Sequence, residues 1–238
     1  MDGALAALRA VDAATLPAAP QGIRIGSPIG ESRNFICIGT NYADTVKPGA
    51  EPPKEPIVFS KAPSCIVGPN DDVLIPKGST RTDWEVEIAI VIGEFADRIA
   101  PEDANDHILG YCLCNDVSER EYQFDRGDTW SKGKGFPTFG PLGPWLVTPD
   151  SIDTAAIELG ISVNGTPMQA GSTSTLLFPP AQIVAYLSQI MILQPGDVIT
   201  TGTPRAVFSG DKVFLKIGDV MELHATGLGA QRQICRQA

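Results

Sequence analysis

The sequence predicts one β-rich, mixed α/β domain with few short helices. The first observation is the distribution of turn-forming residues: 24 Gly and 20 Pro are spread along 238 residues, which is typical of short strands joined by tight turns. The second is that most apolar runs have strand length, and few segments show helical spacing. The third is size, because a chain this long buries enough surface to fold without disulfides or a structural metal.

Nine segments are expected to form strands. Each is a short apolar or alternating run, and Gly, Pro, Asn or Asp residues separate it from its neighbours. The segments are 34–39, 56–60, 72–76, 83–93, 109–116, 144–148, 156–165, 197–202 and 219–227.

Three helices are expected. One lies over 101–108, and a second lies over 179–191, where apolar residues recur at helical spacing. The third opens residues 1–32, which we expect to form a short N-terminal segment of helix and proline-containing connector rather than a signal peptide. No repeat or linker divides residues 33–238, so they are predicted to form the main domain.

Composition restricts the partners. A net charge of -10 and few clustered Lys or Arg argue against nucleic acid, and no apolar run has membrane-spanning length. A small-molecule partner is therefore expected, and an anionic one needs local positive charge in its site. Five cysteines, odd in number and without CxxC spacing, indicate reduced thiols and a cytoplasmic location.

Two carboxylates stand out in the strand segment TDWEVEIAIVIG at 82–93. In a strand Glu85 and Glu87 point to one face, with Cα atoms roughly 6.5 Å apart, so both can reach one hard cation such as Mg²⁺. The alternative is that they occupy the solvent face of an edge strand. Asp116 ends the strand segment at 109–116 and could supply a third carboxylate.

The order and spacing of seven motifs identify a resemblance that covers nearly all of the chain from residue 34 onward. The motifs are GTNYAD (39–44), PIVFSKAPSCIVGPNDDVLIP (56–76), DWEVEIAIVIG (83–93), GYCLCNDVSEREYQ (110–123), KGKGFPTFGPLGPWLVT (132–148), VNGTPMQAGSTSTLLF (163–178) and QPGDVITTGTP (194–204). Together they resemble the fumarylacetoacetate hydrolase family.

This resemblance implies a fold, a cofactor and a set of site residues. The fold is a compact mixed β-sandwich roll, usually assembled as a homodimer, in which residues 33–238 are the catalytic domain. One divalent cation, Mg²⁺ with Mn²⁺ or Ca²⁺ as alternatives, would be held by Glu85, Glu87 and Asp116. The positions that would contact a 2-oxo or enol acid substrate are Tyr42, Arg120, Gln123, Lys134, Thr138 and Thr203.

The chain departs from the family at the loop 41–56, which we expect to be a lid. Hydrolytic relatives carry a His-Glu pair there that activates water, but this chain has Thr45 and Pro48 at those positions. Neither is a base near neutral pH, and a general base contributes about 10²- to 10⁴-fold in rate. Four residues could substitute as the base: Asp44, Glu51, Glu55 and Lys134. The two histidines, His107 and His224, fall outside the matched motifs.

The expected activity is therefore metal-dependent chemistry on an enolate. Isomerisation, tautomerisation or decarboxylation is favoured because these reactions need no activated water, with Lys134, Arg120 and Asp44 as catalytic candidates. Hydrolytic C–C cleavage of an acylpyruvate is the alternative, and a catalytically silent binding homologue is a second one. Arg205 and Phe208 follow the last motif, where they either belong to a variable surface loop or adapt the rim to a different substrate tail.

Overall fold

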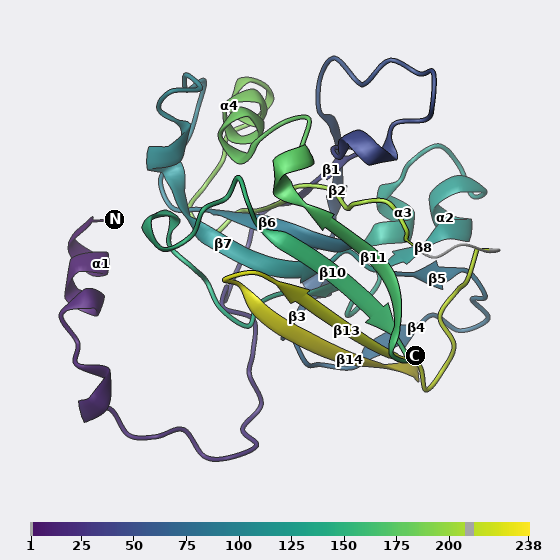
Figure 1. Cartoon of the computed structure of the whole chain (residues 1–238), viewed down its shortest axis with the longest axis horizontal. Coiled ribbons are helices and arrows are strands. Elements are labelled where there is room, and N and C mark those ends of the chain that lie inside the picture. The colour runs from purple at the N-terminus through teal and green to yellow at the C-terminus, as the bar shows by residue number, and fades with distance from the viewer. Residues whose placement is uncertain (1, 208–211) are drawn as a thin grey trace.

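Two five-stranded sheets pack face to face in the computed structural model, which describes residues 2–207 and 212–238 (Figure 1). The first sheet has the strand order β2-β1-β12-β6-β7, and the second has the order β11-β10-β13-β14-β4. Most neighbours are antiparallel, but β1 with β12 and β14 with β4 are parallel. The mixed β-sandwich expected from the sequence is therefore confirmed.

The strands of the first sheet are β1 (Phe35–Gly39), β2 (Ile57–Lys61), β6 (Val86–Ile92), β7 (Ile108–Asn115) and β12 (Val198–Thr200). Those of the second are β4 (Val73–Ile75), β10 (Glu158–Val163), β11 (Thr166–Ser172), β13 (Val220–Ala225) and β14 (Gly229–Gln237). Two short ladders pair β3 (Ile66–Val67) with β9 (Gly140–Pro141), and β5 (Thr82–Asp83) with β8 (Ser118–Glu119). The helices are α1 (Asp2–Arg9), α2 (Arg120–Phe124), α3 (Ser131–Lys134) and α4 (Pro180–Ile190), and the six 3-10 turns are Ala13–Thr15, Ala43–Thr45, Pro63–Cys65, Ala104–His107, Pro149–Ser151 and Thr173–Thr175.

Strand β6 runs through the core. All seven of its residues are buried, and it pairs with β12 on one edge and β7 on the other. The same apolar cluster includes Ile161 and Leu223 from the second sheet and Leu187 from α4. A strand covered on both faces needs apolar residues throughout, which explains its continuous apolar run.

Glutamine side chains tie the two sheets together. Gln169 on β11 accepts a hydrogen bond from the Val86 N–H at 3.1 Å, and Gln231 on β14 donates to the Leu113 carbonyl at 2.8 Å. Gln233 accepts from the Asn115 amide at 3.1 Å. These buried polar groups pair with one another or with backbone, so their burial costs little.

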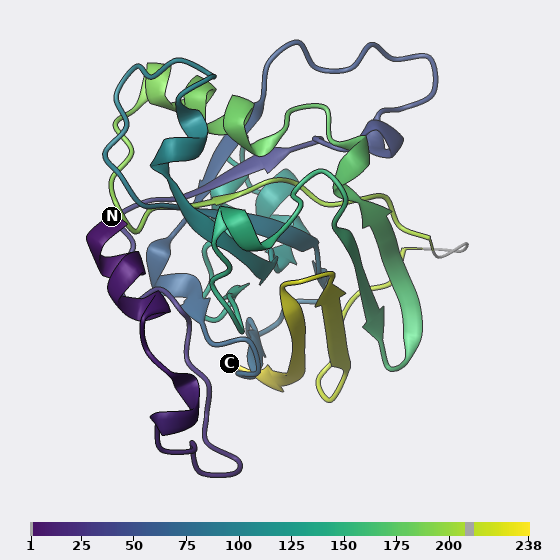
Figure 2. The same cartoon turned by 60° about the vertical axis from the view of Figure 1, so that its left-hand side comes forward.

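The N-terminal segment and the loop 41–56 lie at the periphery in both views (Figures 1 and 2). Arg9 pairs with Asp150 at 2.7 Å and Arg24 donates to Asp71 at 2.6 Å, which attaches the N-terminal segment to the body. The loop leaves the end of β1 and returns at β2. No helix in the described part of the chain has both the length and the apolarity needed to cross a membrane.

Two predicted elements are wrong. The segment 144–148 forms no strand, because it meets β7 at the single pair Tyr111 and Val147. The helix expected over 101–108 is a 3-10 turn at Ala104–His107, in which Ala104 is the one buried residue. Such a segment has no apolar face to stabilise a longer helix by packing.

The prediction also missed β11 and β14. Their inward positions carry Gln169, Gln231 and Gln233 where apolar residues were sought, so the alternating pattern is hidden in the sequence. The short helices α2 and α3 were missed as well, because five and four residues are too few for a periodic signal.

Substituting Ile90→Ala in β6 should lower the free energy of unfolding by about 2–5 kcal/mol, because the side chain is fully buried and its removal leaves a cavity. Urea unfolding measures the change. The matched control is Ile192→Ala, whose side chain is 50% exposed. Equal losses in the two variants would contradict the assignment of β6 to the core.

Candidate active site

Three carboxylates meet where β6 begins and β7 ends. The antiparallel register pairs Val86 with Asn115, and the Asp116 N–H donates to the Glu85 carbonyl at 2.8 Å. One carboxylate oxygen from each of Glu85, Glu87 and Asp116 lies within 4.8 Å of the others. The predicted grouping of these three residues is thus present in the structure.

Glu87 is positioned by the turn after β12. Its Oε2 accepts from the Gly202 N–H at 2.8 Å. Gly202 has φ +93, and a Cβ there would lie 3.0 Å from the Asn41 Cβ and 3.1 Å from the Ile38 carbonyl. Only glycine adopts this conformation at such a close approach without strain. The motif TGTP therefore serves to aim a backbone donor at a buried carboxylate.

Two lysines hold Asp116. Lys134 Nζ donates to Asp116 Oδ2 at 2.7 Å and to Glu85 Oε2 at 2.6 Å. Lys61 Nζ donates to the other oxygen, Asp116 Oδ1, at 2.6 Å and to the Val117 carbonyl at 3.1 Å. The Lys61 and Asp116 side chains are completely buried. Lys61 was not among the site residues expected from the sequence, because it ends a strand whose other residues are exposed or half-buried.

Arg120 and Gln123 come from α2, beside Lys134 on α3. Arg120 donates to Asp83 at 2.6 Å and to Glu85 at 2.7 Å, and its third nitrogen donates to the side-chain oxygen Oε1 of Gln123 at 2.8 Å. The two helices approach closely at Gly133, where a Cβ would lie 2.4 Å from the Glu119 carbonyl. Gly133, the first glycine of KGKGF, therefore lets Lys134 reach the carboxylates.

The charges set the protonation of the cluster. Burial, Asp116 and Glu85 together raise the pKa of Glu87 well above its ordinary value. Burial alone would raise the pKa of Glu85, but Lys134 and Arg120 outweigh it and hold that pKa below its ordinary value. For Lys134, burial lowers the pKa, yet Asp116 and Glu85 raise it overall. The ion-paired groups are stabilised in their charged forms, whereas Glu87 forms no ion pair with any residue that the structure describes.

A cavity of about 220 Å³ opens beside this cluster. Its polar lining includes Glu85, Glu87, Arg120, Gln123, Lys134 and Thr203, and Asp116 lies buried behind it. Thr45, at the position of the absent lid histidine, also lines the cavity, and its hydroxyl donates to the Tyr42 carbonyl at 2.6 Å. The hydroxyl of Thr203 donates to the Val86 carbonyl at 2.8 Å, so Thr203 is bound to the scaffold.

Other expected site residues lie outside the lining of this cavity. Tyr42 is fully buried, and its hydroxyl has no hydrogen-bond partner in the part of the chain that the structure describes. Asp44 is exposed and accepts from the Arg205 N–H at 3.3 Å. The Thr138 hydroxyl accepts from the Leu74 N–H at 2.8 Å, which anchors β4 instead.

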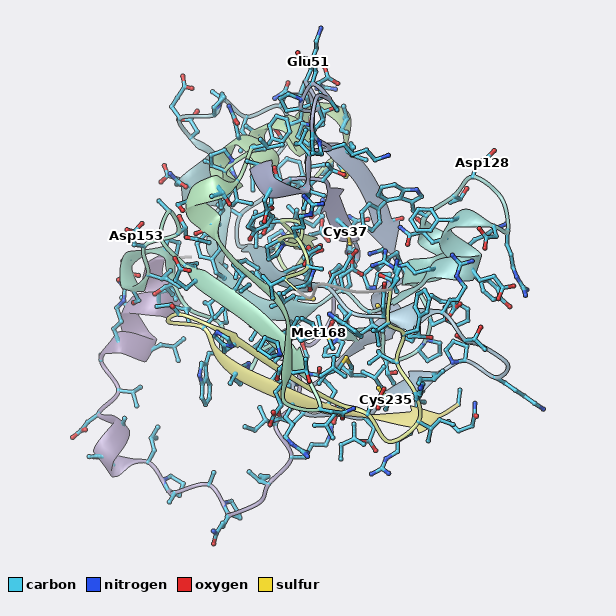
Figure 3. All side chains as sticks on the ribbon, turned by 45° about the vertical axis from the view of Figure 1, so that its right-hand side comes forward. Cys37, Glu51, Asp128, Asp153, Met168 and Cys235 are labelled. Atoms are coloured by element: carbon cyan, nitrogen blue, oxygen red, sulfur yellow. The ribbon has the colours of Figure 1, made fainter. Side chains whose placement is uncertain are left out.

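The remaining candidate bases are exposed. Glu51 projects at the outer tip of the loop (Figure 3), and Glu55 accepts from the Tyr186 hydroxyl at 3.1 Å. His107 lies in the 3-10 turn after Asp103, and His224 is exposed on the second sheet. None of these four lines the cavity. Phe208 lies outside the described residues.

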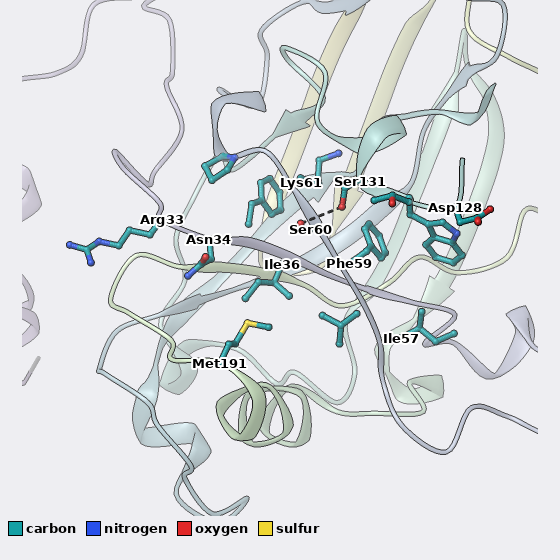
Figure 4. Close-up of a pocket in the computed structure, with 15 residues that line it drawn as sticks. Arg33, Asn34, Ile36, Ile57, Phe59, Ser60, Lys61, Asp128, Ser131 and Met191 are labelled. Atoms are coloured by element: carbon teal, nitrogen blue, oxygen red, sulfur yellow. Dashed lines mark hydrogen bonds between the residues drawn. The ribbon is translucent and has the colours of Figure 1, made fainter. Parts of the chain in front are cut away.

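A second, larger pocket of about 680 Å³ lies against β1 and β2 (Figure 4). It is lined mainly by Ile36, Ile57 and Phe59 with the hydroxyls of Ser60 and Ser131 nearby, and it contains none of the three clustered carboxylates. Its size does not make it the reaction site, because the convergent titratable groups face the smaller cavity.

The order of these site elements along the chain agrees with a known family. Residues 34–235 match the sequence profile described as fumarylacetoacetate (FAA) hydrolase, C-terminal. The chain belongs to the fumarylacetoacetate hydrolase family. The family resemblance expected from the sequence motifs is therefore confirmed.

Individual relatives differ in their named reactions. A protein of Burkholderia ambifaria that carries the provisional name of a hydrolase is 53% identical over all of this chain and 86% of its own length. The structure of a 5-carboxymethyl-2-hydroxymuconate delta-isomerase from Mycobacterium smegmatis is 36% identical with a TM-score of 0.81, covering 90% of this chain and 82% of its own. A fumarylacetoacetate hydrolase from Exiguobacterium antarcticum is 35% identical with a TM-score of 0.86, covering 96% and 83%. The family thus includes proteins named as isomerases and as hydrolases.

The donor set suits a divalent cation. Three carboxylates converge within 4.8 Å, and hard cations such as Mg²⁺, Mn²⁺ and Ca²⁺ prefer such oxygen ligands. Glu87 is buried without a cationic side chain of its own, so a further positive charge would offset the cost of its ionisation. The residues present therefore fit the group that the family commonly holds.

Removing Lys61 should destabilise the protein. Lys61→Met leaves Asp116 with one lysine in a dry environment, and breaking a buried ion pair typically costs about 3–5 kcal/mol. Urea unfolding of the chelator-treated protein measures this loss. The control is Lys212→Met, whose side chain is 57% exposed and lies 3.4 Å from Asp83; its cost should stay below about 1 kcal/mol. Equal costs would show that Lys61 is not a necessary counter-charge.

Glu87 should make the cation-free protein sensitive to pH. Because its pKa is raised in the folded state, the folded protein holds a proton that the unfolded chain releases near its ordinary pKa of 4.5. Stability should be full below that pH and fall as pH rises through the folded-state pKa. Glu87→Gln should remove this decline in chelator-treated protein, measured as melting temperature against pH. Glu222→Gln, with the side chain 54% exposed, is the control and should keep the decline.

Proposed function

We propose that this protein is a divalent-cation-dependent enzyme that isomerises, tautomerises or decarboxylates a small 2-oxo or enol carboxylate. One observation carries the proposal: Glu85, Glu87, Arg120 and Lys134 line one small cavity with Asp116 buried behind it, and Thr45 occupies the lid position that holds a histidine in hydrolytic relatives. The cluster supplies the enolate chemistry of the family. The loop 41–56 contributes Thr45 to the cavity lining, and a threonine hydroxyl is not a base that activates water.

A divalent cation held by Glu85, Glu87 and Asp116 would supply Lewis-acid stabilisation of the charge that develops on an enolate oxygen. Side chains of the protein would do the rest. Arg120 uses one hydrogen on each of its three nitrogens for Asp83, Glu85 and Gln123. Its two remaining N–H groups can bind the substrate carboxylate, since a guanidinium has five donors.

Proton transfer is assigned to Lys134. Its ammonium has three hydrogens, of which Glu85 and Asp116 take two, and the third is available to the cavity. In an enol-to-keto tautomerisation Lys134 would donate a proton to C3 of the substrate and take back the proton that the enol hydroxyl loses, while Arg120 holds the carboxylate. Gln123 accepts from Arg120 through its carbonyl, which orients its NH₂ group to donate elsewhere. The chemistry then needs no lid base.

Hydrolytic C–C cleavage remains a second candidate because the Burkholderia relative carries a hydrolase name and the Exiguobacterium relative is a fumarylacetoacetate hydrolase. The isomerase from Mycobacterium smegmatis favours the first proposal. The two reactions differ in what they require of residues 45 and 48. An enzyme that cleaves acylpyruvates must place a base near its attacking water.

Cation binding should be visible without turnover. A ligand that binds the folded state alone raises its stability, by about 2.7 kcal/mol at a hundredfold excess over Kd. Addition of Mn²⁺ to chelator-treated protein should therefore raise the melting temperature, and Glu85→Gln with Glu87→Gln should abolish the rise. Glu222→Gln should retain it. A full rise in the double variant would exclude the carboxylates as the cation site.

The reaction class is tested with acetylpyruvate and oxaloacetate in the presence of Mn²⁺. Loss of enol absorbance or release of CO₂, without acetate, is expected of the natural chain. The variant Thr45→His with Pro48→Glu restores the lid pair next to the cavity and should gain acetate release from acetylpyruvate. Acetate release by the unaltered protein at the rate of the Thr45→His, Pro48→Glu variant would establish hydrolysis and overturn the isomerase proposal.

A further inference from the structure

The cavity has two chemically different ends. The carboxylates, Arg120, Gln123 and Lys134 form one end, and the other is an aromatic wall of Phe59, Phe124 and Trp130 completed by Ile38. Phe59 and Trp130 meet edge-to-face with ring centroids 5.3 Å apart, and Phe124 meets Trp130 at 6.1 Å. Edge-to-face pairs stabilise one another beyond simple burial, so these rings form an organised surface.

The backbone is shaped to receive this wall. A Cβ at Gly39, the last residue of β1, would lie 2.9 Å from the Trp130 ring. Glycine is therefore needed for the ring to rest on the strand. Behind the wall lies the larger pocket against β1 and β2, which Phe59 and Trp130 also line (Figure 4).

Among the described residues, the wall meets a positive charge at Phe59, where Lys134 Nζ lies 5.1 Å from the ring centroid, whereas neither Phe124 nor Trp130 has a cation over its ring. Among the described residues that line the cavity, the cations are Arg120 and Lys134, and both are paired to carboxylates at the polar end. Arg205 is exposed beyond Thr203, and its backbone N–H faces the acidic Asp44. A carboxylate placed against the rings would lose hydration without gaining a partner, which is costly.

We infer that the substrate is a monocarboxylate: a 2-oxo or enol acid whose tail is apolar or aromatic, selected by Phe59, Phe124 and Trp130. This specificity rests on the proposed function, because it assumes that the polar end binds the 2-oxo acid head. It excludes substrates long enough to place a second carboxylate against the three rings. The aromatic wall is therefore a specificity surface, distinct from the groups that do the chemistry.

The test compares 2-oxoheptanoate with 2-oxoheptanedioate, which differ only in a terminal carboxylate and lack the 4-oxo group that activates C–C cleavage. Calorimetry on the Mn²⁺-loaded protein gives both dissociation constants without turnover. Oxalate, which has the head and no tail, reports the polar end alone. The monoacid should bind about tenfold more tightly or better, since an unpaired charge against apolar surface costs at least about 1.4 kcal/mol.

Two pairs of variants locate the preference. Phe124→Ala should weaken the binding of 2-oxoheptanoate while leaving the binding of oxalate unchanged. Phe95→Ala should change neither dissociation constant. The two side chains are 52% and 51% exposed. Phe124→Arg places a cation on the wall and should reverse the preference toward the diacid, whereas Phe95→Arg should not. Both side chains are half-exposed, so these substitutions should not prevent folding, and oxalate binding verifies that each variant retains the polar end.

The outcomes separate the two proposals. A monoacid preference that Phe124→Arg reverses supports the inference. Equal or tighter binding of the diacid overturns the inference but leaves the proposed function in place. A monoacid preference that persists in Phe124→Arg has the same two consequences. Oxalate binding without either heptanoate overturns the aromatic wall as a tail site. Failure of all three ligands to bind overturns the inference together with the proposed function.

Discussion

The arrangement depends on keeping three carboxylates ionisable inside a protein core. Asp116 is fully buried, and an uncompensated charge there would cost several kcal/mol. Lys61 and Lys134 each take one of its oxygens, and Arg120 joins Lys134 on Glu85. Glu87 receives a backbone N–H instead of a cation. The cluster is therefore balanced for every carboxylate except Glu87, and that imbalance is what makes the site receptive to a further positive charge.

Several elements distant in sequence must meet to maintain this balance. Strand β6 and the end of β7 bring the carboxylates, β2 brings Lys61, the α2–α3 pair brings Arg120 and Lys134, and the turn after β12 brings the Gly202 N–H. The second sheet supports them from the opposite side, where Gln169 binds both the Val86 N–H and the Thr203 hydroxyl. The polar interior of this sandwich thus serves the geometry of the site as well as the contact between sheets.

Our two proposals place chemistry and selectivity on different surfaces of one cavity. In them the carboxylate cluster carries the chemistry, and Thr45 together with the aromatic wall adapts the cavity to the substrate of this chain. Such a division would allow a tail-binding surface to change without disturbing the buried ion pairs. Relatives with the same fold are named for different reactions, since fold alone does not define function.

The sequence by itself determined the sheet-rich class, the main strands and the grouping of Glu85, Glu87 and Asp116. The class, the strands and the pair of glutamates follow from local patterns: apolar runs, turn residues, and the two-residue period that puts both glutamates on one face. Asp116 joined them through the family resemblance. The polar strands β11 and β14, the counter-charge Lys61 and the aromatic wall needed the tertiary structure. Each acquires its role from residues far away in the chain. A buried glutamine or lysine looks like a surface residue until its partner is placed beside it, because the energy that permits its burial comes from that contact alone.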